Sequence, residues 1–341
     1  MKAAVITEKD VVSVQELDVP VAGDGEAIIK VHYCGVCGSD LHVFHGQHPT
    51  AKFPVVPGHE FVGEVVEVKG VGSENFKKGD MVVAQPFYSC GNCEPCANGR
   101  DNVCRNLSFM GAHRNGGFAE YVKVLTRKMY KIPEGMDPRL AALTEPVAVA
   151  VHDVRRSGLK VGQSALIIGG GPIGMLIAMV ARHAGVRRIV ISEIDEFRRT
   201  FAAKHGFKTL NPLDSDFEEK IREYTHGKGF DVTFEVSGSK AGITTAVTHT
   251  TISGMVMVVG MTKEPHPVNL SDMFAKELNM QGVRIHAQYN FIGAIELMRS
   301  GELNDEFMSL VSLEYPLEEI ETALLRSEDP NGIFKILVKC S

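Results

Sequence analysis

The chain has 341 residues, of which 44% are hydrophobic and 23% are charged, and its formal net charge at pH 7 is −6. This size and composition predict a globular protein of one or two domains, and the acidic balance argues against binding of nucleic acid or anionic lipid. The first ten residues lack the apolar core of a signal peptide, and glycines and a proline interrupt the longest apolar run, residues 165–181. We therefore expect no membrane span, and the odd number of cysteines, seven, suits the reducing cytoplasm.

The first part of the chain is predicted to be a β-rich module. Short segments rich in β-branched residues are separated by glycine or proline, which is typical of strands. We expect strands at residues 2–6, 12–16, 26–32, 63–68, 80–84 and 116–122.

The pattern changes at Pro138. Residues 139–152 are predicted to be helix-rich, and from residue 164 onward strand patterns alternate with helical ones, which predicts a parallel, doubly wound sheet. Its expected strands are residues 164–168, 188–192, 230–236 and 255–260, with helices at 196–205 and 217–225. The chain is expected to end with helices at 290–300 and 317–326 and a strand at 333–338.

Four cysteines form the most specific local pattern. Cys90, Cys93, Cys96 and Cys104 have two, two and seven residues between them. Four thiolates at such spacing can surround one Zn²⁺ tetrahedrally and leave no position for a substrate, so a structural zinc lobe is predicted at residues 87–106. Disulfides and an iron–sulfur cluster are the alternatives, and the lack of other secretory features argues against disulfides.

A glycine-rich turn follows the strand predicted at 164–168 and opens an apolar helix. Its glycines allow a tight turn and a close approach to a pyrophosphate at the positive end of that helix. Glu193, nineteen residues beyond Gly174, could accept from both ribose hydroxyls and repel a 2′-phosphate, which favours NAD over NADP. A plain strand–helix connection is the alternative, and arginines at 198 and 199 could weaken the preference for NAD. The candidate cofactor-binding residues are Gly169, Gly171, Pro172, Ile173, Gly174, Glu193 and Arg198.

A second, open metal site is suggested by Cys37 and His59 together with Glu60 or Glu145. A catalytic zinc takes three protein ligands and leaves one position for water or substrate. Each of these residues also has a simpler interpretation: Cys37 could be a core thiol or a redox partner of Cys34, and His59 could be a solvated residue in a turn.

These motifs together resemble the zinc-dependent medium-chain alcohol and polyol dehydrogenases. The resemblance rests on the segments Cys37-Gly-Ser-Asp-Leu-His42 and Gly58-His59-Glu60-x-x-Gly63, on the four-cysteine lobe and on the glycine turn. The segment that begins Thr144-Glu145-Pro146 is similar to the sorbitol dehydrogenase and sugar-acid dehydrogenase branch, such as the idonate and galactonate 5-dehydrogenases. In that branch the glutamate replaces a second cysteine ligand.

The resemblance implies an α/β fold with two domains and two zinc ions per subunit. A GroES-like catalytic domain is expected at residues 1–150 and 288–341, and a Rossmann NAD-binding domain at 151–287. The catalytic zinc is expected on Cys37 and His59, with Glu60 and Glu145 near its remaining positions, one of them through water.

The resemblance also implies the roles of the residues around this zinc. As a Lewis acid, zinc would ease ionisation of the bound alcohol. Ser39 would take the proton and His42 would pass it to solvent through the cofactor ribose, while Asp40 would orient His59. The hydride would then go to the nicotinamide ring.

The sequence defines the substrate less well. Arg114 could pair with a sugar carboxylate, Arg284 lies near a position where polyol dehydrogenases carry a substrate-binding arginine, and His45, His48 and His113 lie near the ligand segments. We expect a small-molecule substrate with several hydroxyls, a polyol or a hexonate. Another alcohol, such as threonine or a small diol, is the alternative, and a non-enzymatic binding protein is a third interpretation, which the retained Cys37, Ser39 and His59 oppose.

Assembly is expected to follow the same resemblance. The strands predicted near residues 255–259 and 280–285 could pair two Rossmann domains edge to edge. We therefore expect a homodimer or a homotetramer.

Overall fold

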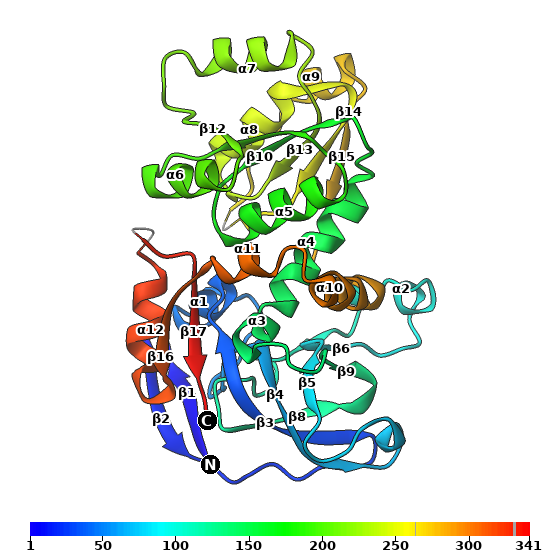
Figure 1. The fold of residues 1–341 in the computed structure, drawn as a ribbon, viewed down its shortest axis with the longest axis vertical. Coiled ribbons are helices and arrows are strands. Elements are labelled where there is room, and N and C mark those ends of the chain that lie inside the picture. Colours follow the sequence, from blue (N-terminus) through cyan, green and yellow to red (C-terminus); the bar gives the residue numbers. More distant parts are fainter. Residues whose placement is uncertain (263, 330–331) are drawn as a thin grey trace. The chain divides into compact units, whose positions relative to one another are not determined.

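The computed structural model describes residues 1–262, 264–329 and 332–341. The described chain forms two compact units, which we call unit 1 (Met1–Ala148 with Ala287–Ser341) and unit 2 (Val149–His286). Figure 1 shows their elements in chain order. In the described part of the chain, no helix is both long enough and apolar enough to cross a membrane.

Unit 1 is built on a seven-stranded sheet whose main path runs β16-β17-β3-β4-β5-β9, with β8 paired to β3. The long strand β3 (Glu26–Gly35) runs antiparallel to β4 (Glu60–Lys69) and to β17 (Lys335–Lys339), so the end of the chain joins strands from its beginning. The other strands of unit 1 are β1 (Lys2–Glu8), β2 (Val11–Glu16), β5 (Met81–Ala84), β6 (Phe87–Tyr88), β7 (Ser108–Phe109), β8 (Tyr121–Leu125), β9 (Met129–Lys131) and β16 (Val311–Pro316).

Short helices and loops complete unit 1 around an apolar core. Val31, Val65 and Val338 belong to that core and come from three different strands of the sheet. Helix α4 (Thr144–Ser157) begins in unit 1 and ends in unit 2. The other helices of unit 1 are α1 (Gly38–Phe44), α2 (Glu94–Ala97), α3 (Pro138–Ala142), α10 (Gln288–Ser300), α11 (Asn304–Met308) and α12 (Ile320–Ser327), with 3₁₀ turns η1 (Ser73–Asn75), η2 (Asp101–Val103), η3 (Thr126–Lys128) and η4 (Leu317–Glu319).

Unit 2 contains a six-stranded parallel sheet in the order β12-β11-β10-β13-β14-β15. The strands are β10 (Ser164–Ile168), β11 (Arg188–Ser192), β12 (Lys208–Leu210), β13 (Phe230–Glu235), β14 (Thr250–Val258) and β15 (Asn279–Gly282). The helices are α5 (Pro172–His183), α6 (Glu196–Lys204), α7 (Phe217–Thr225), α8 (Lys240–His249) and α9 (Leu270–Ala275).

This strand order is that of a Rossmann fold. The chain adds β11 and β12 on one side of β10 and then β13, β14 and β15 on the other side, so the strand order reverses between β10 and β13. In such sheets, ligands bind beyond the carboxyl ends of the strands at the reversal point. The predicted combination of a β-rich domain with a doubly wound parallel sheet is thus confirmed.

Candidate metal centres and cofactor site

The two segments that carry Cys37 and His59 are held together by a single carboxylate. Cys37 is the N-cap residue of α1, and its backbone N–H donates to Asp40 Oδ2 at 3.0 Å. Asp40 Oδ1 accepts from the backbone N–H of Gly58 at 2.9 Å and lies 3.3 Å from His59 Nδ1. Because Asp40 is almost fully buried, water competes little for these bonds. This geometry fixes the His59 ring so that Nε2 is the nitrogen left to bind a metal.

Three ligand atoms converge at this point. One atom each from Cys37, His59 and Glu60 lie within 4.8 Å of one another, and both His59 and Glu60 are buried. Thiolate, imidazole and carboxylate are the ligand types of catalytic zinc sites. These residues fit a zinc ion, and fewer than four protein ligands would leave a coordination position open.

Ser39 and His42 lie on the short helix α1, three residues apart, which places them on the same face of the helix. Ser39 Oγ lies 3.4 Å from His59 Nε2, so its hydroxyl is next to the ligand atoms. His42 is in the last turn of α1.

Glu60 forms a buried ion pair that the sequence analysis missed. Lys335 Nζ, from β17, lies 2.8 Å and 2.7 Å from the two carboxylate oxygens of Glu60 and also donates to the carbonyl of Val36 at 3.0 Å. A Cβ at Gly35, directly across the β3–β4 ladder, would lie 2.2 Å from Glu60 Oε2, so the carboxylate needs a glycine there. The signal in the sequence was a lysine inside the apolar strand 333–338.

Burial and neighbouring charges act against each other at this pair. Burial raises the pKa of Glu60, and the charge of Lys335 opposes this shift. For Lys335, burial favours the neutral amine, but the Glu60 carboxylate prevails and raises the pKa of Lys335.

Glu145 lies in the first turn of α4 and is buried. Burial has the largest effect on the pKa of Glu60 and raises it, and the charges of Lys335 and His59 come next and lower it. The charge of Glu145 also raises this pKa, so the two carboxylates are neighbours. Among the described residues, the ligand atoms of Cys37, His59 and Glu60 lie within 4.8 Å of one another, and Glu145 is not part of this group.

The four cysteines of the lobe form a closed cluster. Cys93 Sγ lies 3.4 Å from Cys96 Sγ and 3.8 Å from Cys104 Sγ, and Cys104 Sγ lies 3.5 Å from Cys90 Sγ. Four thiolates at about 2.3 Å from a tetrahedral zinc would be about 3.8 Å apart, whereas a disulfide would be far shorter. The cluster therefore fits one zinc ion, and the seven cysteines form no disulfide in the structure.

The pKa values in the lobe show why a cation is needed. Backbone N–H groups of Arg105 and Cys96 lower the pKa of Cys93 to about 6, whereas burial and the neighbouring Cys93 raise the pKa of Cys96 to about 12. Four adjacent thiols cannot all ionise together unless a positive ion compensates their charge.

The glycine turn connects β10 to α5 at the reversal point of the unit 2 sheet. Gly169 has a φ of 102°, which favours glycine, and a Cβ at Gly174 would lie 2.0 Å from the Gly169 carbonyl oxygen. Gly171 is the N-cap residue of α5, and Pro172 occupies its first turn, where a missing N–H costs no helical bond. The N-terminus of α5 thus faces outward from the carboxyl end of β10, where an anion can bind.

Glu193, at the end of β11, reaches back to this turn. Its carboxylate accepts from the backbone N–H groups of Gly170 at 2.7 Å and Asp195 at 2.9 Å. Arg198 Nη1 lies 3.9 Å from Glu193 Oε2, and Arg199 donates to the carbonyls of Glu193 and Ile194. Arg199 thus holds the end of β11 in place, and Arg198 is the arginine next to the carboxylate.

The two candidate substrate arginines lie in different units. The Arg114 guanidinium packs 4.5 Å above the centre of the Tyr88 ring, and its Nε donates to Ser108 Oγ at 2.9 Å. Arg284 is an exposed residue of unit 2. A role in substrate binding remains a prediction for both.

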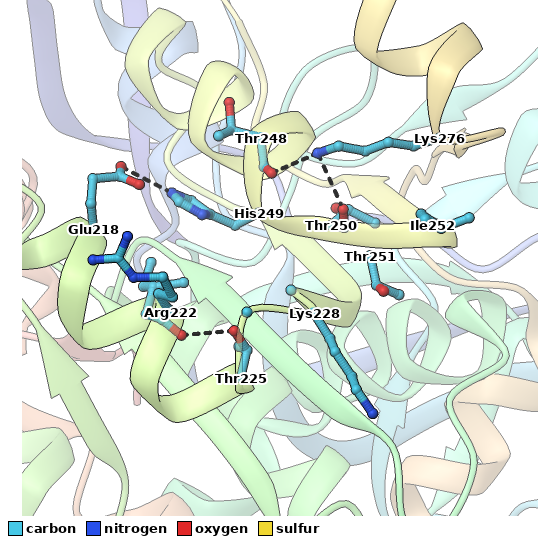
Figure 2. A pocket seen from close by; sticks show the side chains of 13 residues that line it. Glu218, Arg222, Thr225, Lys228, Thr248, His249, Thr250, Thr251, Ile252 and Lys276 are labelled. Carbon is cyan, nitrogen blue, oxygen red and sulfur yellow. Dashed lines mark hydrogen bonds and ion pairs between the residues drawn. The ribbon is translucent and has the colours of Figure 1, made fainter.

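A cavity of about 620 Å³ lies elsewhere in unit 2, at the amino ends of β13 and β14 (Figure 2). His249 Nε2 lies 3.3 Å from Glu218 there, and Lys276 donates to the carbonyl of Thr248 at 2.7 Å. The cavity contains none of the predicted site residues, and the glycine turn lies at the opposite, carboxyl ends of the strands.

Comparison with known proteins gives two family matches. Residues 23–134 match the alcohol dehydrogenase GroES-like domain, and residues 172–300 match the zinc-binding dehydrogenase family. A 2-dehydro-3-deoxy-L-galactonate 5-dehydrogenase of Pseudoalteromonas atlantica is 39% identical over 93% of this chain and 92% of its own.

Solved structures agree with these matches. The 2R,3R-butanediol dehydrogenase of Bacillus subtilis superposes with a TM-score of 0.91 at 32% identity and covers 100% of this chain and 99% of its own. A candidate zinc-binding dehydrogenase of Sinorhizobium meliloti 1021, bound to NADP, has the same TM-score and identity over 99% of this chain and 98% of its own.

Proposed function

Because the chain belongs to the zinc-dependent medium-chain alcohol dehydrogenase family, we propose that it transfers a hydride from a secondary alcohol of a polyol or sugar acid to NAD, giving the ketone. The observation that carries this proposal is the open group of Cys37, His59 and Glu60, distinct from the closed cluster of four cysteines. An open site next to a hydroxyl and a closed site in a loop suit one catalytic and one structural zinc.

Residues of unit 1 would hold the catalytic zinc and move the proton. Cys37 and His59 bind the ion, and Glu60 and Glu145 supply the carboxylates next to it. When bound, zinc supplies Lewis acidity at the alcohol oxygen. Ser39, beside His59, accepts the alcohol proton, and His42, on the same face of α1, passes it on.

Residues of unit 2 would hold the cofactor. The pyrophosphate lies against the N-terminus of α5, where Gly169, Gly171 and Gly174 permit close approach. Each Glu193 oxygen accepts one backbone N–H and retains lone pairs for the ribose hydroxyls, which favours NAD. Arg198 lies beside this carboxylate, where it can also attract a 2′-phosphate, so we infer that NADP is used with lower efficiency.

The substrate class follows from the relatives. One relative is named for a 5-dehydrogenation of a sugar acid and a structural neighbour for oxidation of a vicinal diol. Other relatives are named L-threonine 3-dehydrogenase, which keeps an amino alcohol as the second candidate substrate.

The working form would be a homodimer or homotetramer in a reducing compartment, the cytoplasm. Strand β15 is the last strand of the unit 2 sheet, and Met280 on it is exposed. Phe274 and Leu270, on the preceding helix α9, are 87% and 75% exposed, so apolar surface accompanies the free sheet edge. The absence of disulfides among the seven cysteines suits a reducing environment.

The proposal is tested by NADH formation with a panel of five- and six-carbon polyols, hexonates, threonine and simple alcohols. We expect turnover of a polyol or hexonate that is lost after zinc chelation and restored by added zinc. Turnover of threonine alone would keep the mechanism and overturn the substrate class. No turnover of any alcohol by zinc-loaded protein would overturn the enzymatic function.

A further inference from the structure

Glu235, the last residue of β13, is a buried carboxylate that belongs to none of the sites described above. It is 1% exposed. Its Oε1 accepts from the backbone N–H of Ser237 at 3.0 Å and from the Ser237 hydroxyl at 2.5 Å, and its Oε2 accepts from the backbone N–H of Gly238 at 3.1 Å. Both oxygens are thus engaged by one turn, residues 237–238, directly beyond the carboxyl end of the strand.

A chain of hydroxyl groups extends this network to the N-terminus of α8. A carboxylate can only accept, so the Ser237 hydroxyl donates to Glu235, and its oxygen accepts from Ser239 Oγ, 2.8 Å away. Ser239 is the N-cap residue of α8, and its Oγ accepts from the backbone N–H of Gly242 at 2.9 Å. Each bond in the chain therefore has a fixed direction, and the chain ends at Glu235.

The turn that Glu235 holds is packed between two other backbone segments. On one side, a Cβ at Gly169, in the glycine turn, would lie 3.1 Å from the backbone nitrogen of Ser237. On the other side, a Cβ at Gly260, just beyond β14, would lie 2.3 Å from the backbone nitrogen of Gly238 and 2.9 Å from Glu235 Oε2. The Glu235 carbonyl also accepts from the backbone N–H of Gly260 at 2.9 Å. Glu235 therefore fixes the backbone at the carboxyl ends of three neighbouring strands, β10, β13 and β14.

The strand order indicates which part of the cofactor meets this backbone. A dinucleotide lies across the point where the strand order reverses, with its pyrophosphate at the N-terminus of α5. Glu193, which we propose binds the adenosine ribose, follows β11 on one side of β10. The nicotinamide half would then extend to the other side of β10, over the ends of β13 and β14.

We propose that Glu235 is a positioning residue for the nicotinamide half of the cofactor, because its carboxylate holds the backbone of residues 237–238 and 260 in the shape that this half binds. The inference rests on the proposed function and deepens it. Since Glu235 is buried and both of its oxygens bond to the turn, it acts through this backbone and not by contact with the ligand. A surface that is ordered before binding loses less conformational entropy when the ligand arrives, which tightens binding.

The test compares the binding of NADH with that of ADP, which lacks the nicotinamide and its ribose, by calorimetric titration of the zinc-loaded enzyme. Glu235→Gln keeps the size of the side chain, but its NH₂ group can only donate and would face the backbone N–H of Ser237 or Gly238. We expect Glu235→Gln to raise the Kd of NADH by about 10- to 100-fold, as for a lost hydrogen bond to a charged group, and the Kd of ADP by less than about threefold.

Thr233→Val is the matched control. Thr233 lies two residues earlier on β13, is fully buried, and its hydroxyl bonds with Thr250 Oγ1 at 2.7 Å. Valine has nearly the same shape but cannot make this bond, so the variant should lose stability and keep the wild-type Kd for both ligands. If Glu235→Gln weakens NADH and ADP equally, or weakens neither, Glu235 only supports the sheet and the proposal is wrong.

Hydrogen exchange in the absence of cofactor gives a second readout. The amides of residues 236–239 and 259–261 should exchange faster in Glu235→Gln than in the wild type, whereas the Gly170 amide, which donates to Glu193, should not change. Unchanged exchange at residues 236–239 would overturn the assignment.

The binding data also separate this inference from the proposed function. A wild-type enzyme that binds NADH more tightly than ADP but oxidises no alcohol would refute the proposed function, while the effect of Glu235→Gln on NADH would still uphold the role of Glu235. If the wild type binds NADH no more tightly than ADP, the protein does not hold the nicotinamide half, and the inference is wrong whatever the turnover.

Discussion

At the residue scale, the candidate catalytic centre depends on two buried carboxylates that hold other groups in place. Asp40 bonds to the backbone of Cys37 and Gly58 and lies against His59, so it sets the orientation of both segments. Glu60 is held by both of its oxygens through Lys335. Such buried ion pairs contribute little net stability, but removal of one partner leaves a costly unpaired charge.

This argument predicts the behaviour of Lys335→Met. In zinc-free protein, where no metal can compensate for Glu60, the variant should lose about 3–5 kcal/mol of stability, because the buried carboxylate has no cation left. Scanning calorimetry of the transition that belongs to unit 1 would measure the loss. Glu60→Gln combined with Lys335→Met should recover most of it, since the variant pair carries no charge. If Lys335→Met alone is as stable as the double variant, Glu60 and Lys335 are not energetically coupled and the prediction is wrong.

At the element scale, the four-cysteine lobe is a local structure. Its four thiols lie within fifteen residues: Cys96 is on the short helix α2, and the other three are in the loops next to α2 and η2. The ligands of the open site come instead from the N-cap of α1 (Cys37), from the residue before β4 (His59) and from the first residue of β4 (Glu60). The two metal sites therefore share no element.

We accordingly predict that Cys93→Ser lowers the zinc content from two ions per chain to one. Residues 90–104 should then exchange amide hydrogens faster, because three thiols and a hydroxyl bind zinc poorly. Metal analysis and hydrogen exchange would measure the two effects. Cys340→Ser is the control: its buried thiol donates to the Gly117 carbonyl and a hydroxyl can do the same, so two zinc ions should remain. Loss of both ions from Cys93→Ser would refute the independence of the sites.

At the scale of the whole molecule, the unit 2 sheet ends in β15, which pairs only with β14 among the residues that the structure describes. Native proteins usually protect the edges of their sheets, and an exposed edge favours pairing with another chain. The apolar side chains around β15 add to this tendency.

Light scattering should therefore show a dimer or a tetramer for the wild-type chain. Met280→Asp, which places a charge on β15, should lower the mass toward that of a monomer at micromolar concentration. Val161→Asp, at a residue that is 81% exposed outside this edge, should leave the mass unchanged. A monomeric wild-type chain would refute the prediction.

Local sequence was enough for the features whose parts are close along the chain. The glycine turn was readable because strand, turn and helix follow directly, and the thiol cluster because its ligands are a few residues apart. The alternation of strands and helices predicted the Rossmann sheet, and the strand predicted near residues 280–285 corresponds to β15 (Asn279–Gly282). The short strand β12 was missed because three residues carry too little periodicity. The predicted strand 255–260 begins earlier, as β14 at Thr250.

Only the tertiary structure decided how distant segments meet. Lys335 reaches Glu60 across 275 residues of chain because β17 and β4 flank β3, and no local pattern encodes that strand order. The hydrogen bond from the backbone N–H of Ala51 to His48 Nδ1, at 3.0 Å, likewise exists only in the folded loop. By itself, then, the sequence determined the ligand types, the glycine turn and the two-part fold, because these depend on spacing and periodicity. The pairing of buried charges and the direction of hydrogen bonds came from long-range register, which only the folded chain defines.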